Sequence, residues 1–224
     1  MFLSFVTNLL EPLSYLIFSI ALFVQLNIFK KTRIRVLFIY NLIATVSLSY
    51  ASWLAHRSMN NNYIYNLLYL PAVIAFCFYF YRAFKSKKNK RIVLGVLVFN
   101  IVYFLARLFL SGPLALLDSV AYSLLSISVC FLSFLFFYAI LSGISENKIW
   151  HQFDFWLVSA LLLYFLGSFF IFLMYSNLTY NILSTYTNEQ RKSLTILWGV
   201  HNVLLFLSSL TTLFSSLWIS YRNR

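Results

Sequence analysis

The stretch FDFWLVSALLLYFLGSFFIFL at residues 153–173 carries one charged side chain, Asp154, in 21 positions. A helix needs roughly 20 predominantly apolar residues to cross the hydrocarbon core of a bilayer. Because a helix also satisfies its own backbone hydrogen bonds in lipid, this stretch predicts a transmembrane helix. The rest of the chain repeats the pattern.

Seven apolar stretches of this kind fill most of the 224 residues and leave no room for a separate soluble domain. The composition agrees, since 62% of residues are hydrophobic and 10% are charged, against about 25% charged in soluble domains. We therefore predict an all-α, polytopic protein with a single seven-helix transmembrane domain over residues 1–224. The predicted spans cover residues 5–28, 36–56, 63–82, 92–111, 115–141, 153–175 and 193–220.

The basic residues predict how the chain is oriented. Thirteen of the seventeen Lys and Arg residues fall in the first, third and fifth loops and in the C-terminal tail. Lys and Arg near span ends are retained on the cytoplasmic side, so we expect the N-terminus outside and the C-terminus in the cytoplasm. The KSKKNKR run at residues 85–91 is interpreted as a topology anchor that can also attract anionic lipid.

The net charge of +12 is explained by this topology. We therefore expect membrane lipid, and no nucleic acid, as a partner.

Ionisable side chains inside spans are costly and usually functional. Glu11, Arg107, Asp118 and His201 all fall in the predicted outer half, while hydroxyls, aromatics and amides make up the polar groups of the inner half. This distribution predicts a polar cavity that faces the extracytoplasmic side. Within it, Arg107 should pair with Asp118, or less favourably with Glu11, because an unpaired charge at that depth is costly.

Two interpretations of Glu11 stay open. Pro12 follows it, and proline is favoured in the first turn of a helix, so Glu11 could lie at the interface and interact with the helix dipole. The alternative is a buried, functional carboxylate.

Two helices carry polar side chains on one face. In the span 193–220, residues at three- and four-residue spacing should share an inward face. They are Trp198, His201, Asn202, Leu205 and Ser209. In the span 115–141, Asp118, Tyr122 and Ser126 form a similar stripe.

The sequence holds 46 aromatic residues. They could line a pocket for an apolar ligand, whereas base composition and interfacial girdles are the simpler explanation of their number. Tyr63, Tyr65 and Tyr69 are predicted to form an interfacial girdle on the outer side, and Trp150 and Trp156 one on the inner side.

Four segments together resemble small seven-helix inner-membrane proteins of Bacteroidota-type bacteria. They are LEPLSYLIFSIALF at 10–23, NNNYIYNLLYL at 60–70, LLDSVAYSLLS at 116–126 and the stretch at 153–173. The resemblance spans most of the chain and implies a multi-pass protein of the bacterial inner membrane, without implying an activity. Its recurrent features fall on Glu11, Pro12, Asp118 and Trp156.

A partial resemblance links the chain to the CREST membrane hydrolases, the alkaline ceramidase-like group. Their zinc site uses a Ser and a His in the second helix and paired His in the seventh. Ser52 and His56 have the S-x-x-x-H spacing and His201 lies in the last span, but Leu205 stands where a second His is expected.

Other positions depart from this family as well. Leu48 stands where a Glu is expected, and the span 63–82 has no Asp. A catalytic zinc needs three protein ligands, and Cys77 and Cys130 are isolated. We therefore expect no metal and no cofactor.

The sequence favours a receptor, sensor or binding component for an apolar or amphipathic small molecule, and not an enzyme. Because the tail Tyr221 to Arg224 contains no signalling domain, such a receptor would act through a separate signalling protein. A membrane-embedded lipid hydrolase and a small-solute transporter are the alternatives. The candidate ligand-binding residues are Glu11, Arg107, Asp118, Tyr122, Trp198, His201 and Asn202.

Overall fold

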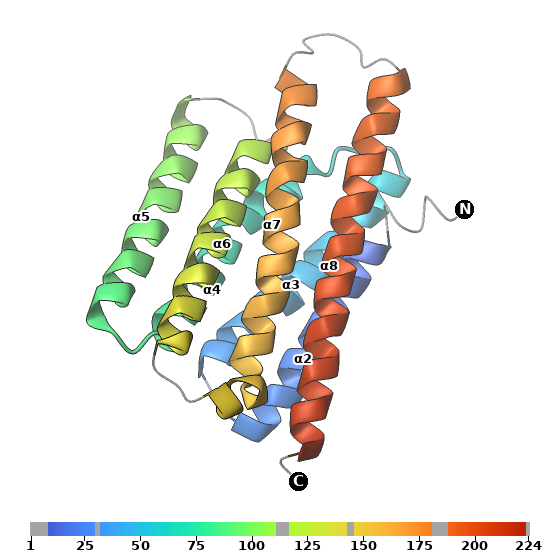
Figure 1. The fold of residues 1–224 in the computed structure, drawn as a ribbon. Coiled ribbons are helices and arrows are strands. Elements are labelled where there is room, and N and C mark those ends of the chain that lie inside the picture. The colour runs from blue at the N-terminus through green and yellow to red at the C-terminus, as the bar shows by residue number, and fades with distance from the viewer. Residues whose placement is uncertain (1–8, 30–31, 111–116, 143–145, 181–187, 223–224) are drawn as a thin grey trace.

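The structure, a computed structural model, describes residues 9–29, 32–110, 117–142, 146–180 and 188–222 (Figure 1). Its described residues form seven α-helices and one short 3₁₀ helix, so the predicted all-α class is confirmed. The elements are α2 (Leu10–Phe29), α3 (Thr32–His56), α4 (Asn62–Ala83), α5 (Lys87–Leu110), α6 (Ser119–Leu141), η1 (Glu146–His151), α7 (Phe153–Tyr180) and α8 (Asn188–Arg222).

Six of these helices, α3 to α8, are long and apolar enough to cross a membrane, which supports a multi-pass membrane protein. The apolar part of α2, Leu10–Leu26, is shorter. Several helices begin before their predicted spans, as α5 does at Lys87 and α8 at Asn188. Hydropathy marks the part that lies in hydrocarbon, whereas the helix continues into its polar flanks.

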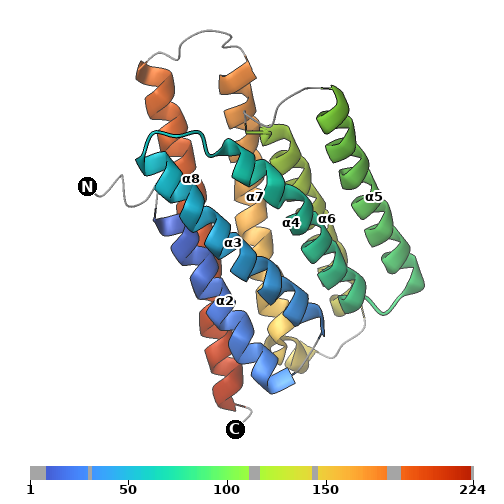
Figure 2. The ribbon, with the colours of Figure 1, turned by 180° about the vertical axis from the view of Figure 1, so that it is seen from behind.

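The helices form a closed ring with one helix outside it (Figures 1 and 2). Going round the ring, α2 packs on α3, α3 on α4, α4 on α6, α6 on α7, α7 on α8, and α8 returns to α2. Helix α5 packs against α4 and α6 from outside. Large apolar side chains such as Val98, Val102 and Phe109 are exposed on α5, as a lipid-facing helix requires.

Helices that follow one another in the sequence alternate in direction, so each end of the bundle gathers a distinct set of residues (Figure 1). We call the end where α2, α4, α6 and α8 begin the Asp118 end, and the opposite end, where α7 begins, the Asp154 end.

Polar contacts fix α8 against both of its ring neighbours. Gln25 on α2 donates from Nε2 to the backbone oxygen of Ser216 at 3.0 Å. Ser208 donates to the backbone oxygen of Ala160 on α7 at 2.8 Å. Such close approach of helices in lipid depends on small residues at the contact, and α8 supplies buried Ser209, Thr212 and Ser216 there.

Candidate functional site

A small chamber lies inside the ring toward the Asp118 end. Its volume is about 20 Å³, which is room for roughly one water molecule. Each of the six ring helices contributes at least one side chain, and none of the lining residues belongs to α5. The lining is mostly aromatic and consists of Glu11, Tyr15, Tyr40, Leu48, Tyr65, Leu68, Tyr122, Tyr164, Phe172, Trp198 and His201.

Glu11 lies in the first turn of α2 and points into this chamber. Its side chain is buried, with 5% exposure, and its carboxylate accepts a hydrogen bond from the Tyr65 hydroxyl at 3.0 Å. Of the two interpretations of Glu11, the structure supports the buried carboxylate. Pro12 still occupies the first helical turn, where its missing N–H costs nothing.

Tyr65 is held in place from two sides. Besides its bond to Glu11, its backbone oxygen accepts a hydrogen bond from the Tyr122 hydroxyl at 2.6 Å. These bonds connect α2, α4 and α6 around the chamber and place Tyr122, a predicted site residue, on its wall.

His201 forms the α8 side of the chamber and is almost completely buried. Its Nε2 lies 3.3 Å from the Tyr164 hydroxyl and its Nδ1 lies 3.2 Å from Oγ of Ser168. The ring centroids of Phe172 and Trp198 lie 5.0 and 5.2 Å from that of His201. The imidazole is thus fixed by polar contacts at both nitrogens and by aromatic contacts at its faces and edges.

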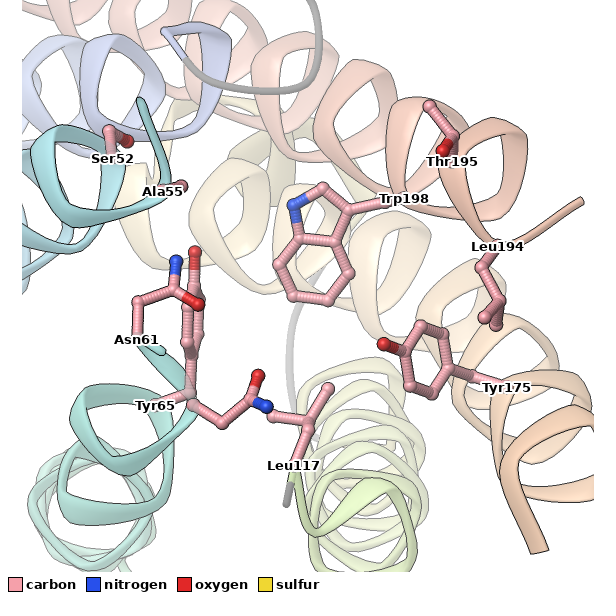
Figure 3. Close-up of a pocket in the computed structure, with 10 residues that line it drawn as sticks. Ser52, Ala55, Asn61, Tyr65, Leu117, Tyr175, Leu194, Thr195 and Trp198 are labelled. Carbon is pink, nitrogen blue, oxygen red and sulfur yellow. The ribbon is translucent and has the colours of Figure 1, made fainter. Parts of the chain in front are cut away.

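A second cavity, which we call the vestibule, lies at the Asp118 end and has a volume of about 310 Å³. In Figure 3, Trp198 and Tyr175 face Asn61 and Tyr65 across it. Tyr65 and Trp198 line both the vestibule and the chamber. Hydroxyl, amide and aromatic groups make up most of its wall, which consists of Ser52, Ala55, Asn61, Asn62, Tyr65, Leu117, Tyr175, Leu194, Thr195 and Trp198.

The rings of Tyr65 and Trp198 pack edge to face where the two cavities meet, with centroids 5.3 Å apart. This geometry is favourable for aromatic pairs. The pair therefore forms the floor of the vestibule and the roof of the chamber.

Arg107 and Asp118 form the predicted ion pair, with Nε and Oδ2 3.2 Å apart. The structure places Asp118 one residue before α6, so this helix begins later than the predicted span 115–141. There it acts as the N-cap and accepts a hydrogen bond from the backbone N–H of Ala121. Tyr103 also donates to it.

This pair joins α5 to the start of α6 and lines neither cavity. Of the predicted site residues, the chamber thus brings together Glu11, Tyr122, Trp198 and His201. Arg107 and Asp118 contact each other away from it. The connection at 111–116 lies outside the described residues.

The predicted inward face of α8 is confirmed, since His201, Asn202, Leu205 and Ser209 are all buried. Asn202 lines neither cavity. The structure therefore places Asn202 in the packed face of α8 and not on a cavity wall.

Tyr15, Tyr40, Tyr164 and Phe172 line the chamber but were missing from the predicted site. The girdle prediction was also wrong for Tyr65 and Tyr69, which are buried inside the bundle with 9% and 1% exposure. The four-residue spacing of Glu11 and Tyr15, and of Tyr164, Ser168 and Phe172, was an available signal. Among 46 aromatic residues this spacing did not stand out.

The Asp154 end carries a buried carboxylate that was not counted among the candidate site residues. Asp154 is paired with Arg33 and accepts a hydrogen bond from the Tyr79 hydroxyl at 3.0 Å. Both Arg33 and Asp154 line a third cavity of about 540 Å³. The prediction that ionisable groups avoid this half was therefore wrong.

The histidines of the described chain are dispersed. His56 is exposed at the end of α3 while His201 is buried in the chamber. No group of three or more His, Cys, Asp or Glu side chains that could hold a metal occurs among the described residues.

Comparison of the chain with protein-family models, curated proteins and solved structures found no match.

Proposed function

We propose that this protein is a receptor-type or binding component of the bacterial inner membrane that takes up an amphipathic small molecule from the extracytoplasmic side. In this proposal the chain spans the membrane seven times, with α2 as the first span, the N-terminus outside and the C-terminus in the cytoplasm. The observation that carries the proposal is the stacked pair of cavities at the Asp118 end, joined at Tyr65 and Trp198.

The size and lining of the vestibule support a small ligand. Its volume of about 310 Å³ falls at the lower end of the range for small-molecule sites. Aromatic faces would contact the apolar parts of the molecule, while hydroxyls and amides would orient its polar groups. Asn61 and Thr195 supply such groups from opposite walls.

The charge distribution supports the orientation. Basic residues concentrate around the Asp154 end, where Arg33, Arg82 and the run at 85–91 lie. By the positive-inside rule this end would be cytoplasmic and the vestibule would open outside. Lys30, Lys31 and Arg224 lie outside the described residues.

A matched pair of substitutions tests the proposal. Thr195→Trp would fill the vestibule, whereas Ile196→Trp adds the same side chain at a neighbouring position whose side chain is half exposed. Purified protein in nanodiscs would be screened for thermal stabilisation by a library of small amphipathic molecules. Compounds that stabilise the unmodified chain should lose their effect in Thr195→Trp and keep it in Ile196→Trp. Equal effects in both variants would contradict a vestibule site.

A transporter is a second candidate because the third cavity, at the Asp154 end, also contains a buried carboxylate. Buried side chains such as Phe80, Val129 and Leu157 fill the core of the bundle, so passage would require their rearrangement. Uptake of a vestibule ligand into proteoliposomes would favour this candidate. Binding without uptake would favour a receptor that acts through a separate signalling protein.

The Ser168–His201 contact is the feature that would support the hydrolase alternative, because a nucleophilic serine needs a neighbouring base. Ser168 is completely buried and lines neither cavity. The proposal therefore includes no reaction.

A further inference from the structure

We infer that the chamber binds the primary ammonium group of a small organic amine, with Glu11 as its counter-charge. This inference rests on the proposed function and assigns a chemical class to the ligand. Four observations carry it: the buried carboxyl group of Glu11, the size of the chamber, its aromatic walls and its connection to the vestibule.

The first observation is that Glu11 is a buried acidic group without a basic neighbour. Its described hydrogen-bond partner is the neutral hydroxyl of Tyr65, and no ion pair to Glu11 occurs within the described residues. Arg107, the nearest candidate from the sequence, is paired with Asp118 instead. A buried carboxylate is stabilised by an opposite charge or by a bound proton, so a cation that entered the chamber would find its counter-charge in Glu11.

His201 does not fill that place. Both of its ring nitrogens lie within hydrogen-bond distance of hydroxyls, Tyr164 on one side and Ser168 on the other. Its contacts are therefore complete without Glu11.

The second observation is the size of the chamber. A volume of about 20 Å³ holds roughly one water molecule, and an ammonium group is close to a water molecule in size. A quaternary ammonium group carries three further methyl groups and would not fit. The remainder of the ligand must therefore lie elsewhere.

The third observation is the wall. Rings of Tyr15, Tyr40, Tyr65, Tyr122 and Trp198 surround the chamber. Aromatic faces attract cations through the ring quadrupole, most strongly where water is excluded. Tyr hydroxyls add acceptors for the three N–H donors of a primary ammonium group.

The fourth observation is the junction between the cavities. Tyr65 contacts Glu11 through its hydroxyl and forms half of the Tyr65–Trp198 pair under the vestibule. A ligand that parts these two rings would place its ammonium group at Glu11 and its organic part among the hydroxyls and amides of the vestibule.

The test compares amines with alcohols of nearly the same shape. Tyramine and 2-(4-hydroxyphenyl)ethanol form one pair, and benzylamine and benzyl alcohol form another. Binding to the full chain in nanodiscs is measured by titration calorimetry, with empty nanodiscs as the blank. We expect an amine to bind at least tenfold more tightly than its alcohol, as for a hydrogen bond to a charged group.

Glu11→Gln should reduce this preference to less than twofold, because the amide keeps the shape and removes the charge. Glu189→Gln is the matched control, since Glu189 is an exposed carboxylate near the same end of the bundle, and it should leave the preference unchanged. Circular dichroism and thermal unfolding establish that both variants fold.

The outcomes separate this inference from the proposed function. If amine and alcohol bind equally and Thr195→Trp blocks both, the ammonium site is wrong while the vestibule stands. A permanently protonated Glu11 would give this result. If the amine preference survives in Glu11→Gln, or if neither amine binds, the inference is overturned. If binding persists in Thr195→Trp, the proposed function fails as well.

Discussion

The hydroxyl of Tyr65 donates a hydrogen bond to the carboxylate of Glu11 at 3.0 Å, across 54 positions of sequence. This bond joins the first turns of α2 and α4 inside the ring. Tyr65→Phe keeps the ring that packs on Trp198 and removes the donor. We expect the free energy of unfolding, from SDS titration in mixed micelles, to fall by about 1–3 kcal/mol, since a buried acceptor loses its partner.

Tyr50→Phe is the control for that measurement. Tyr50 is half exposed and stacks on Trp53, so removal of its hydroxyl should change the free energy by less than about 0.5 kcal/mol. Equal effects of the two substitutions would argue against a special role for the Tyr65 hydroxyl.

The Arg107–Asp118 pair should couple weakly. Its side chains are 28% and 12% exposed, so a double-mutant cycle with Arg107→Ala and Asp118→Asn should give about 0.5–1 kcal/mol. Asparagine also caps helices well, whereas Asp118→Ala removes the cap of α6 and should cost about 1 kcal/mol more. Additive single substitutions would show that the pair contributes nothing to stability.

The Arg33–Asp154 pair should stabilise the fold more than the Arg107–Asp118 pair does. Its side chains are less exposed, at 20% and 9%, and Tyr79 also donates a hydrogen bond to the carboxylate. Arg33→Ala leaves Asp154 without this cation and should lower the free energy of unfolding by about 3 kcal/mol. Arg35→Ala, at an exposed position of the same helix, should change it by about 0.5 kcal/mol or less. The same SDS titration compares the two, and a loss of equal size in both would contradict a buried pair.

Topology can be measured with reporter fusions. Alkaline phosphatase fused after Arg224 should be inactive and a green fluorescent protein at that position should fluoresce, because the positive-inside rule places this end in the cytoplasm. Alkaline phosphatase inserted within residues 57–61 should be active. An active phosphatase after Arg224 would reverse the sidedness of the vestibule.

Hydropathy predicted the helices well because each span must be apolar over a length that the bilayer fixes. Three- and four-residue spacing predicted the buried face of α8 for the same kind of reason, since His201 and Leu205 repeat with the helical period. The Arg107–Asp118 contact followed from the cost of an unpaired charge in a span and from the closeness of the two residues in sequence. All three features depend on local sequence.

The chamber could not be predicted in this way because it depends on which distant helices are neighbours. Glu11 and His201 share a cavity since α2 packs on α8, and no local pattern encodes that contact. Tyr40 and Tyr164 have ordinary apolar surroundings in sequence. Their role in the chamber appears only when the ring closes.

The contact that closes the ring, between α2 and α8, also orders events during synthesis of the protein. Translation runs from the N-terminus, so α2 is made before α8 and Gln25 has no Ser216 to bond to until α8 has been synthesised. A nascent chain that ends before α8 lacks Trp198, His201 and Ser216. Its α2 would therefore lack the helix that accepts the hydrogen bond of Gln25. The chamber can therefore form only after α8 has joined α2, which makes its assembly a late step in folding.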